Sequence, residues 1–247
     1  MSALNRTTRS PGILVAVMAL VALGGCGSDK IFMTYPDEAI DFSLQGQPMP
    51  SLYIDTVTDM RPIEQREGQG SFFKITYPDD DSWEAPATTI YAEALAQDLE
   101  QTHLVELVPL HSQADYVLSV DLISMGCRLE RSPTSFLLTG ALGAGLGFVL
   151  SDEDPEKLAV ALAAVSILAV PVPTRNRAEA EVRMTLKDRQ GEVLWQKSCF
   201  GEYEGKSYMT PTARQDQKMV DEYLTKAVKR ANGCLLGQLR QQFLQGK

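Results

Sequence analysis

The sequence is poor in the residues from which most catalytic and metal sites are built. Its 247 residues include only two histidines and four cysteines. His103 and His111 flank a short apolar stretch, and the pattern brings no partner to either as a metal ligand or acid–base pair. No serine lies in a Gly-x-Ser-x-Gly motif, and the glycine-rich run 140–147 lacks the Lys-Ser or Lys-Thr of a phosphate-binding loop. We therefore expect no enzymatic activity, no cofactor and no metal.

Basic residues are also few. The chain has 23 Lys and Arg against 32 Asp and Glu, which gives a formal net charge of −9. Binding to phosphate backbones needs clustered Lys and Arg, so no nucleic-acid partner is expected. The same acidity disfavours electrostatic docking onto anionic lipid head groups.

The first apolar run is too short to span a bilayer. It covers residues 13–23, whereas a membrane-spanning helix needs about 20 apolar residues. Arg6 and Arg9 precede it, and Leu23-Gly24-Gly25-Cys26 follows it. This order of charge, apolar run and small residues predicts a secretory signal.

Leu23-Gly24-Gly25-Cys26 resembles the bacterial lipobox, in which a cysteine after small residues receives a diacylglycerol. The resemblance implies that residues 1–25 are removed, that Cys26 is lipidated, and that membrane lipid is one partner of the chain. Two or three acyl chains anchor a protein stably. In similar enterobacterial lipoproteins, an aspartate directly after the cysteine favours the inner membrane; here Gly27 follows. We therefore expect an outer-membrane anchor with the domain facing the periplasm.

Three further cysteines, Cys127, Cys199 and Cys234, could form one disulfide in an oxidising periplasm. Three pairings are possible, and the sequence does not choose among them. The alternative is that all three are buried free thiols that pack as small apolar groups.

Residues 26–49 carry scattered apolar residues with proline and glycine, and they predict a lipidated tether. Residues 50–247 predict one periplasmic α+β domain. Alternating apolar residues indicate strands at 51–58, 104–110, 114–131, 177–187 and 192–201, and residues 71–77 fit an edge strand or a covering loop. Helical spacing indicates helices at about 88–102 and 212–244. The expected fold is a mixed or mainly antiparallel four- to five-stranded sheet, with two helices packed on one face and an apolar hairpin insertion.

The segment Asp188-x-x-Gly191-x-x-x-Trp195 follows an alternating strand and precedes the C-terminal helix. This arrangement resembles small envelope lipoproteins, among them ABC-transport auxiliary lipoproteins and activators of penicillin-binding proteins. Their fold is similar to the amino-terminal domain of the Tol-system translocation protein. The resemblance covers roughly residues 50–245 apart from the insertion. It implies a non-catalytic accessory role in envelope assembly or transport, through an envelope protein partner or a homo-oligomer, and it assigns no individual binding residue.

The apolar insertion, residues 135–173, contains two uncharged segments, 136–150 and 158–172. As helices each would be about 22 Å long, shorter than a bilayer core of about 30 Å. Gly143 and Gly147 have the Gly-x-x-x-Gly spacing that lets helices approach closely. The residues expected to contact membrane or oligomer are Phe136, Leu137, Gly140, Gly143, Gly147, Leu150, Leu158, Leu162 and Ile167.

Four interpretations of this insertion stay open. The pair of segments could fold as a helical hairpin against the protein's own core or a second copy, dip into the outer membrane, or dock onto a partner's apolar groove. It could also build an oligomeric pore, which would resemble the curli secretion channel lipoprotein. The segments lack the polar–apolar alternation of barrel strands. An oligomeric channel or secretion component is therefore the alternative to the accessory role.

Overall fold

The structure is a computed structural model. It describes residues 42–44, 48–68, 70–71, 74–131, 172–209 and 213–245, together with single residues at 30, 33, 137, 140, 141, 156, 160, 162 and 163. The predicted signal peptide and the lipidation site Cys26 lie outside these residues. So do six of the nine residues expected to contact membrane or oligomer: Phe136, Gly143, Gly147, Leu150, Leu158 and Ile167.

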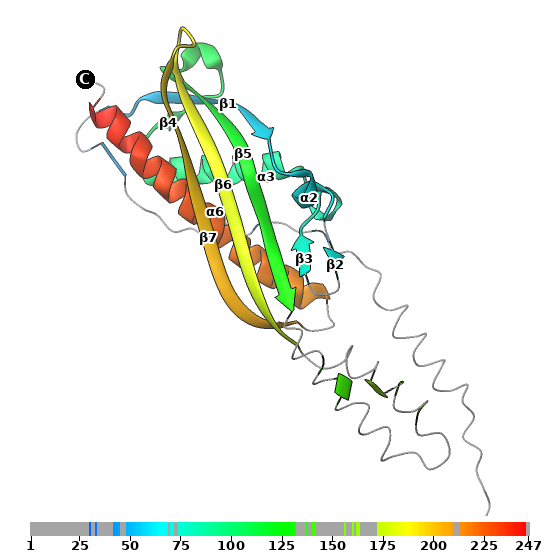
Figure 1. Cartoon of the computed structure of the whole chain (residues 1–247). Coiled ribbons are helices and arrows are strands. Elements are labelled where there is room, and N and C mark those ends of the chain that lie inside the picture. The colour runs from blue at the N-terminus through cyan, green and yellow to red at the C-terminus, as the bar shows by residue number, and fades with distance from the viewer. Residues whose placement is uncertain are drawn as a thin grey trace, which may run out of the picture.

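The described chain forms one mixed sheet with helices packed against it (Figure 1). The strands are β1 (Ser51–Asp59), β2 (Gly70–Ser71), β3 (Lys74–Tyr77), β4 (Glu106–Leu107), β5 (Tyr116–Arg131), β6 (Val172–Asp188) and β7 (Val193–Met209). The helices are α2 (Ile63–Arg66), α3 (Ala87–Thr102) and α6 (Ala213–Gln245), with short 3-10 turns η1 (Asp80–Ser82) and η2 (His111–Gln113). The predicted α+β class is confirmed.

Strand β5 is the centre of the sheet. On one side it pairs antiparallel with β6, which pairs antiparallel with β7. On its other side, β1 runs parallel to its first half and β3 runs antiparallel to its second half. The sheet has seven strands rather than the four or five predicted. The added strands are β2 and β3, which lie around residues 71–77, the segment that the sequence left open as an edge strand or a covering loop. The strand predicted at 104–110 is reduced to the two residues of β4, which pair with Ser51 and Leu52 of β1.

A β-bulge in β5 sets which side chains enter the core. The register with β6 shifts between Leu122 and Ser124. Before the bulge even-numbered residues such as Leu118 are buried, and after it odd-numbered residues such as Met125 are buried. The extra residue lets a strand of 16 residues keep apolar side chains on one face along its whole length.

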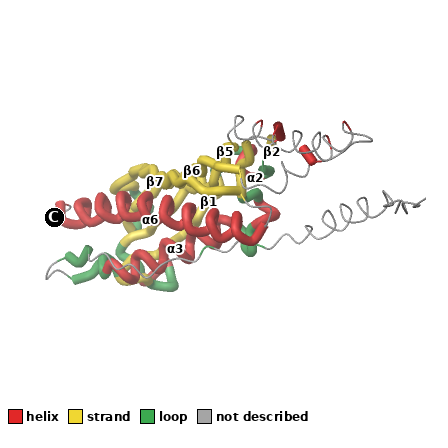
Figure 2. The backbone as a smooth tube through the Cα atoms, turned by 90° about the horizontal axis from the view of Figure 1, so that it is seen from below, coloured by secondary structure: helices red, strands yellow, loops and turns green. Residues whose placement is uncertain are grey.

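The two long helices bury their apolar faces against this core. Helix α6 packs mainly on β7 and β6, whereas α3 packs on β1 and β4 and also contacts α6 (Figure 2). Helix α6 buries residues at helical spacing: Val220, Leu224, Val228, Ala231, Leu235 and Leu239. In the described part of the chain, no helix combines the length and apolar character needed to cross a bilayer.

Helix α6 and β7 approach unusually closely at Gly201. A Cβ atom on this residue would lie 1.9 Å from the carbonyl oxygen of Ala227 and 2.7 Å from the backbone nitrogen of Ala231. Only glycine permits that separation of helix and strand backbones. The contact therefore fixes where α6 crosses the edge of the sheet.

Three of the residues predicted to contact membrane or oligomer lie in the described part of the insertion. Leu137 has helical backbone geometry and is 71% exposed. Val160, in the second apolar segment of the insertion, is also 71% exposed. Gly140 and Leu162 are half-buried. The predicted tether also contributes to the domain, since Leu44 is buried in the core and the Phe42 amide donates to the carbonyl oxygen of Thr102 over 3.0 Å.

Candidate functional site

A groove of about 520 Å³ lies between the C-terminal half of α3 and the middle of α6. Its lining comes from both helices, from β7 and from the segment before β1. The lining residues are Phe42, Asp98, Gln101, Thr102, Tyr203, Thr225, Lys226, Lys229, Arg230, Gly233 and Leu236. The groove is large enough for side chains of a partner or a small ligand.

A buried polar chain joins the two helices beside the groove, and one of its members, Asp98, lines the groove. The Tyr91 hydroxyl donates to Asn232 Oδ1 over 2.7 Å, and Asn232 Nδ2 donates to Asp98 Oδ2 over 2.8 Å. Lys229 Nζ lies 3.6 Å from Asp98 Oδ1 and balances this buried carboxylate. Burial, and then the charge of Asp98, raise the pKa of Tyr91 well above its ordinary value. The hydroxyl therefore stays protonated and keeps its role as donor.

One wall of the groove is basic and aromatic. Lys226 and Arg230 lie one helical turn apart on α6, with Lys226 Nζ 4.5 Å and the Arg230 guanidinium carbon 5.3 Å from the centre of the Tyr203 ring. Lys226 Nζ also donates to Glu222 Oε1 over 2.6 Å. That bond, and then the one to the Tyr203 hydroxyl, raise the pKa of Lys226. The wall therefore keeps its positive charge at any physiological pH.

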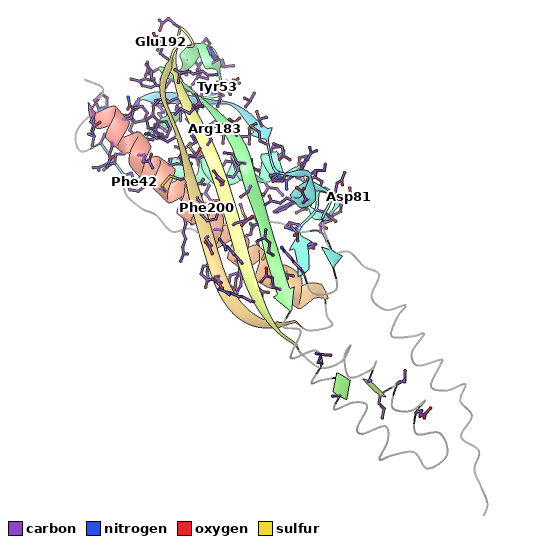
Figure 3. The ribbon with its side chains drawn as sticks, in the orientation of Figure 1. Phe42, Tyr53, Asp81, Arg183, Glu192 and Phe200 are labelled. Atoms are coloured by element: carbon purple, nitrogen blue, oxygen red, sulfur yellow. A yellow bond between two sulfur atoms is a disulfide. The ribbon has the colours of Figure 1, made fainter. Side chains whose placement is uncertain are left out.

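A hydroxyl without a described partner faces the same region. Thr225 lines the groove, and its Oγ1 atom is buried without a hydrogen bond to any residue that the structure describes. Phe42 also lines the groove, and its carbonyl oxygen accepts from Arg240 Nε over 3.1 Å. Phe42 lies beside α6 (Figure 3). Buried hydroxyls in folded domains are usually paired, so Thr225 Oγ1 is an exception within the described residues.

Chemically, the groove favours an occupant that carries negative charge and accepts hydrogen bonds. Among the described lining residues there are three cations, Lys226, Lys229 and Arg230, and a single carboxylate, Asp98. This local excess contrasts with the net charge of −9 of the whole chain. No group of three or more His, Cys, Asp or Glu side chains within the described ranges is placed to hold a metal ion.

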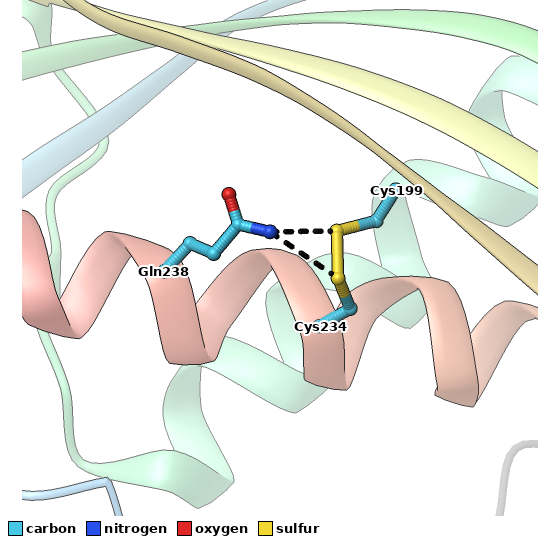
Figure 4. Close-up of a disulfide and its surroundings, with 3 residues drawn as sticks. All are labelled: Cys199, Cys234 and Gln238. Atoms are coloured by element: carbon cyan, nitrogen blue, oxygen red, sulfur yellow. Dashed lines mark hydrogen bonds between the residues drawn. A yellow bond between two sulfur atoms is a disulfide. The ribbon is translucent and has the colours of Figure 1, made fainter.

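A disulfide stabilises the helix that carries the basic wall. Cys199 of β7 and Cys234 of α6 are bonded, so the structure selects one of the three pairings that the sequence leaves open. Gln238 Nε2 lies 3.2 Å from Cys199 Sγ and 3.4 Å from Cys234 Sγ (Figure 4). Cys127 is a buried free thiol, and burial, followed by the charge of Glu179, raises its pKa to about 12.

Neither histidine is among the residues that line the groove. His103 ends α3 in a left-handed conformation with φ of 50°, and His111 packs edge-on against Tyr53 with ring centres 5.8 Å apart. The sheet face that points away from the helices carries ion pairs, such as that between Arg183 Nη2 and Asp121 Oδ2 at 2.8 Å. The same face carries the exposed Phe200 (Figure 3).

The groove residues were not predicted from the sequence. A signal is present, because Lys226, Lys229 and Arg230 recur at the three- and four-residue spacing of one helix face. The pattern is also typical of a solvated helix face. Only the position of α3 and Tyr203 opposite these cations turns that face into a groove.

Comparison of the sequence with family models and with curated proteins finds no match. Among solved structures, a Xanthomonas campestris protein assigned to the family model DUF330 is similar with a TM-score of 0.45 and 12% identity, covering 87% of this chain and 97% of the other. A minor lipoprotein from Acinetobacter baumannii has a TM-score of 0.33 and 10% identity, with 79% and 92% covered. A lipoprotein from Neisseria meningitidis has a TM-score of 0.24 and 10% identity, with 80% and 96% covered. Superpositions this loose transfer no residue role to the present chain.

Proposed function

We propose that the chain is an outer-membrane-anchored lipoprotein that acts as a non-catalytic accessory in envelope assembly or transport, through contacts with other proteins. Its domain would face the periplasm on a tether that begins at the acylated Cys26. The observation that carries the protein-contact role is the groove between α3 and α6, whose basic wall fits an acidic segment of a partner protein.

Two features support the compartment. The lipobox-like sequence Leu23-Gly24-Gly25-Cys26 follows a positively charged and apolar signal. The Cys199–Cys234 disulfide fits an oxidising compartment, since such bonds are rare in the cytosol of most cells. Both features favour an exported protein.

The anchor is tested with a Cys26→Ser chain exported by a cleavable signal. A clickable palmitate analogue should label the wild-type chain and leave the Cys26→Ser chain unlabelled. The unlipidated chain should be recovered in the soluble periplasmic fraction, and none should remain with the membranes after alkaline extraction. Labelling that survives the substitution would exclude Cys26 as the lipidation site.

The groove is tested by photo-crosslinking in whole cells. A photoreactive residue at Gly233 points into open space, because no described atom lies within 4 Å of the place that a Cβ would occupy there. We expect an adduct with one defined envelope protein, and we expect Arg230→Glu to abolish that adduct by reversing the charge of an exposed groove residue. The matched control is a photoreactive residue at Lys197, an exposed position of β7 outside the lining. Equal adducts from both positions, or an adduct insensitive to Arg230→Glu, would exclude the groove as the docking site.

An oligomeric channel or secretion component is the second candidate, favoured by the exposure of Leu137 and Val160, each 71%. A photoreactive residue at Leu137 separates the two. A ladder of self-adducts from Leu137, with none from Gly233, would support the oligomer and exclude the accessory role through the groove.

A further inference from the structure

A second cavity, of about 390 Å³, lies at the N-terminal end of α3. Its walls come from the end of β1, from α2, from η1 and from the loop that leads into α3. The lining residues are Asp59, Arg61, Arg66, Asp80, Trp83, Glu84, Ala85, Pro86, Ala87 and Thr88. Ten residues of helix, about 15 Å at 1.5 Å per residue, separate Thr88 from the groove residue Asp98. The two sites are therefore distinct.

Arg61 is the unusual residue of this cavity. Its side chain is 1% exposed, yet it comes from a loop. The Nε atom donates to Asp59 Oδ1 over 3.0 Å, and Nη2 donates to Asp59 Oδ2 and Asp80 Oδ1 over 2.8 and 2.6 Å. The remaining nitrogen, Nη1, is buried without a hydrogen-bond partner among the described residues. A buried guanidinium donor left unpaired is costly, which indicates a place for an acceptor.

Trp83, which lines the same cavity, has a second unpaired donor. The residue is 3% exposed, and its indole Nε1 is buried without a hydrogen bond to the part of the chain that the structure describes. Indole nitrogen can only donate, so it needs an acceptor. Of the three carboxylates in the lining, Asp59 and Asp80 are engaged by arginines, and Glu84 does not accept a hydrogen bond from the indole.

The first turn of α3 adds further hydrogen-bond donors, the backbone amides at the start of the helix. The first amides of a helix have no partner within the helix, and Pro86 at the N-cap provides no side-chain hydrogen bond. Ala87 and Thr88, the first two residues of the helix, line the cavity. The positive end of the helix dipole therefore lies at the cavity that Arg61 and Trp83 also line.

The charges of the lining limit what can bind. Asp59 and Asp80 are matched by Arg61 and Arg66, and Glu84 is the remaining charged group of the described lining. Burial alone would raise the pKa of Asp59, but hydrogen bonds from Arg61 and the charges of Arg61 and Arg66 hold it below its ordinary value. The Asp59 carboxylate thus stays ionised. The lining therefore holds three carboxylates against two arginines and repels a doubly charged phosphate more than a singly charged carboxylate, which can still accept from several donors at once.

We propose that the cavity at the N-terminus of α3 binds one carboxylate group, which accepts hydrogen bonds from Arg61 Nη1, Trp83 Nε1 and the first amides of the helix. The carboxylate comes from a free organic acid or from the C-terminus of a peptide. This ligand site is separate from the proposed partner groove, and neither depends on the other.

The test uses the two tryptophans of the chain, Trp83 and Trp195. The full chain is labelled with indole-¹⁵N tryptophan, held in detergent micelles and titrated with sodium acetate, N-acetylalanine, N-acetylalanine amide and inorganic phosphate. A Trp83→Phe chain assigns the two indole signals. We expect acetate and N-acetylalanine to shift the Trp83 signal saturably, with little change at Trp195, and we expect no saturable shift from the amide or from phosphate.

The relative affinities distinguish the two sources. Binding of N-acetylalanine at least about tenfold tighter than acetate indicates a peptide C-terminus, and equal binding indicates a free organic acid. Absence of a saturable Trp83 shift up to 50 mM of either acid would overturn the proposal, because the unpaired donors would then bind only water. An equal shift with the amide would overturn it as well.

Two arginine variants isolate the guanidinium. Arg61→Lys keeps the positive charge but has no Nη1, so carboxylate affinity should fall at least about tenfold, as expected when a charge-assisted hydrogen bond is lost. Arg66→Lys is the matched control, because Arg66 is also paired with Asp80 but is 45% exposed. The affinity of the Arg66→Lys chain for the carboxylate should differ from that of the wild type by less than twofold. If the Arg61→Lys chain lacks the Trp195 signal of the folded protein, the variant has unfolded. The comparison of N-acetylalanine with its amide on the wild-type chain then still tests the proposal.

Discussion

Replacing Gly201 by alanine tests how α6 packs on β7. The new Cβ would lie 1.9 Å from the Ala227 carbonyl oxygen, whereas ordinary contact begins at 3.4 Å. Helix and strand would therefore have to separate by roughly 1.5 Å. Both clashing groups are backbone atoms, and the Cys199–Cys234 disulfide holds the helix to the strand two residues away. We expect a loss of about 3 kcal/mol in the free energy of unfolding, at the upper end of overpacking costs.

The assay is urea unfolding of the oxidised Cys26→Ser chain, followed by far-UV circular dichroism. Gly237→Ala is the matched control, since Gly237 lies in α6 and no described atom lies within 4 Å of the place that the new methyl group would occupy. Alanine in a helix interior should stabilise the chain by about 0.5–1 kcal/mol. A Gly201→Ala cost below about 1 kcal/mol, or a shift of the same sign in both variants, would refute the close approach of α6 and β7.

Three further predictions concern the cysteines and one ion pair. Reducing the Cys199–Cys234 bond, which closes a separation of 35 residues, should lower the free energy of unfolding by about 4 kcal/mol in the same urea assay; an unchanged midpoint would contradict the bond. Iodoacetamide at pH 8 should modify Cys127 only after unfolding, because the thiol is buried with a pKa of about 12, and mass spectrometry checks this. The pKa of Asp59 is lower in the folded chain than in the unfolded chain. The ionised Asp59 therefore stabilises the fold fully above about pH 4, and this contribution is lost as the pH falls through the pKa of the folded chain. The difference in urea midpoint between wild type and Asp59→Asn should therefore shrink from pH 6 to pH 2, and a constant difference would argue against the Asp59–Arg61 pair.

Strong periodicity predicted the long elements well. The helix expected at 212–244 is α6 at Ala213–Gln245, and the hairpin around Asp188 and Gly191 joins β6 to β7. Both rest on local patterns, since the spacing of apolar residues follows directly from helix and strand geometry. The hairpin strands extend further than predicted because β6 and β7 continue pairing from Val172 to Met209 beyond the clearly alternating stretch.

Elements that depend on distant contacts were missed. Helix α2 has only four residues, and its Gln65 is buried because its Oε1 accepts from the Met125 amide over 3.0 Å and its Nε2 donates to Glu179 over 3.1 Å. No local pattern encodes partners that lie 60 and 114 residues away in the chain. Helix α3, in contrast, was predicted to within one residue, since it begins at Ala87 after Pro86 and the predicted start was about residue 88.

The sequence by itself determined the α+β class, the long helix and hairpin, and the expectation of an exported, lipid-anchored chain, because charge, apolar spacing and short motifs act locally. The tertiary structure alone decided which cysteines pair, since Cys199 and Cys234 meet only where α6 crosses β7 at Gly201. It also decided both candidate sites. The α6 cations form a groove only opposite α3 and Tyr203, and Arg61 and Trp83 have unpaired donors within the described chain only because folding buries them together beside the first turn of α3.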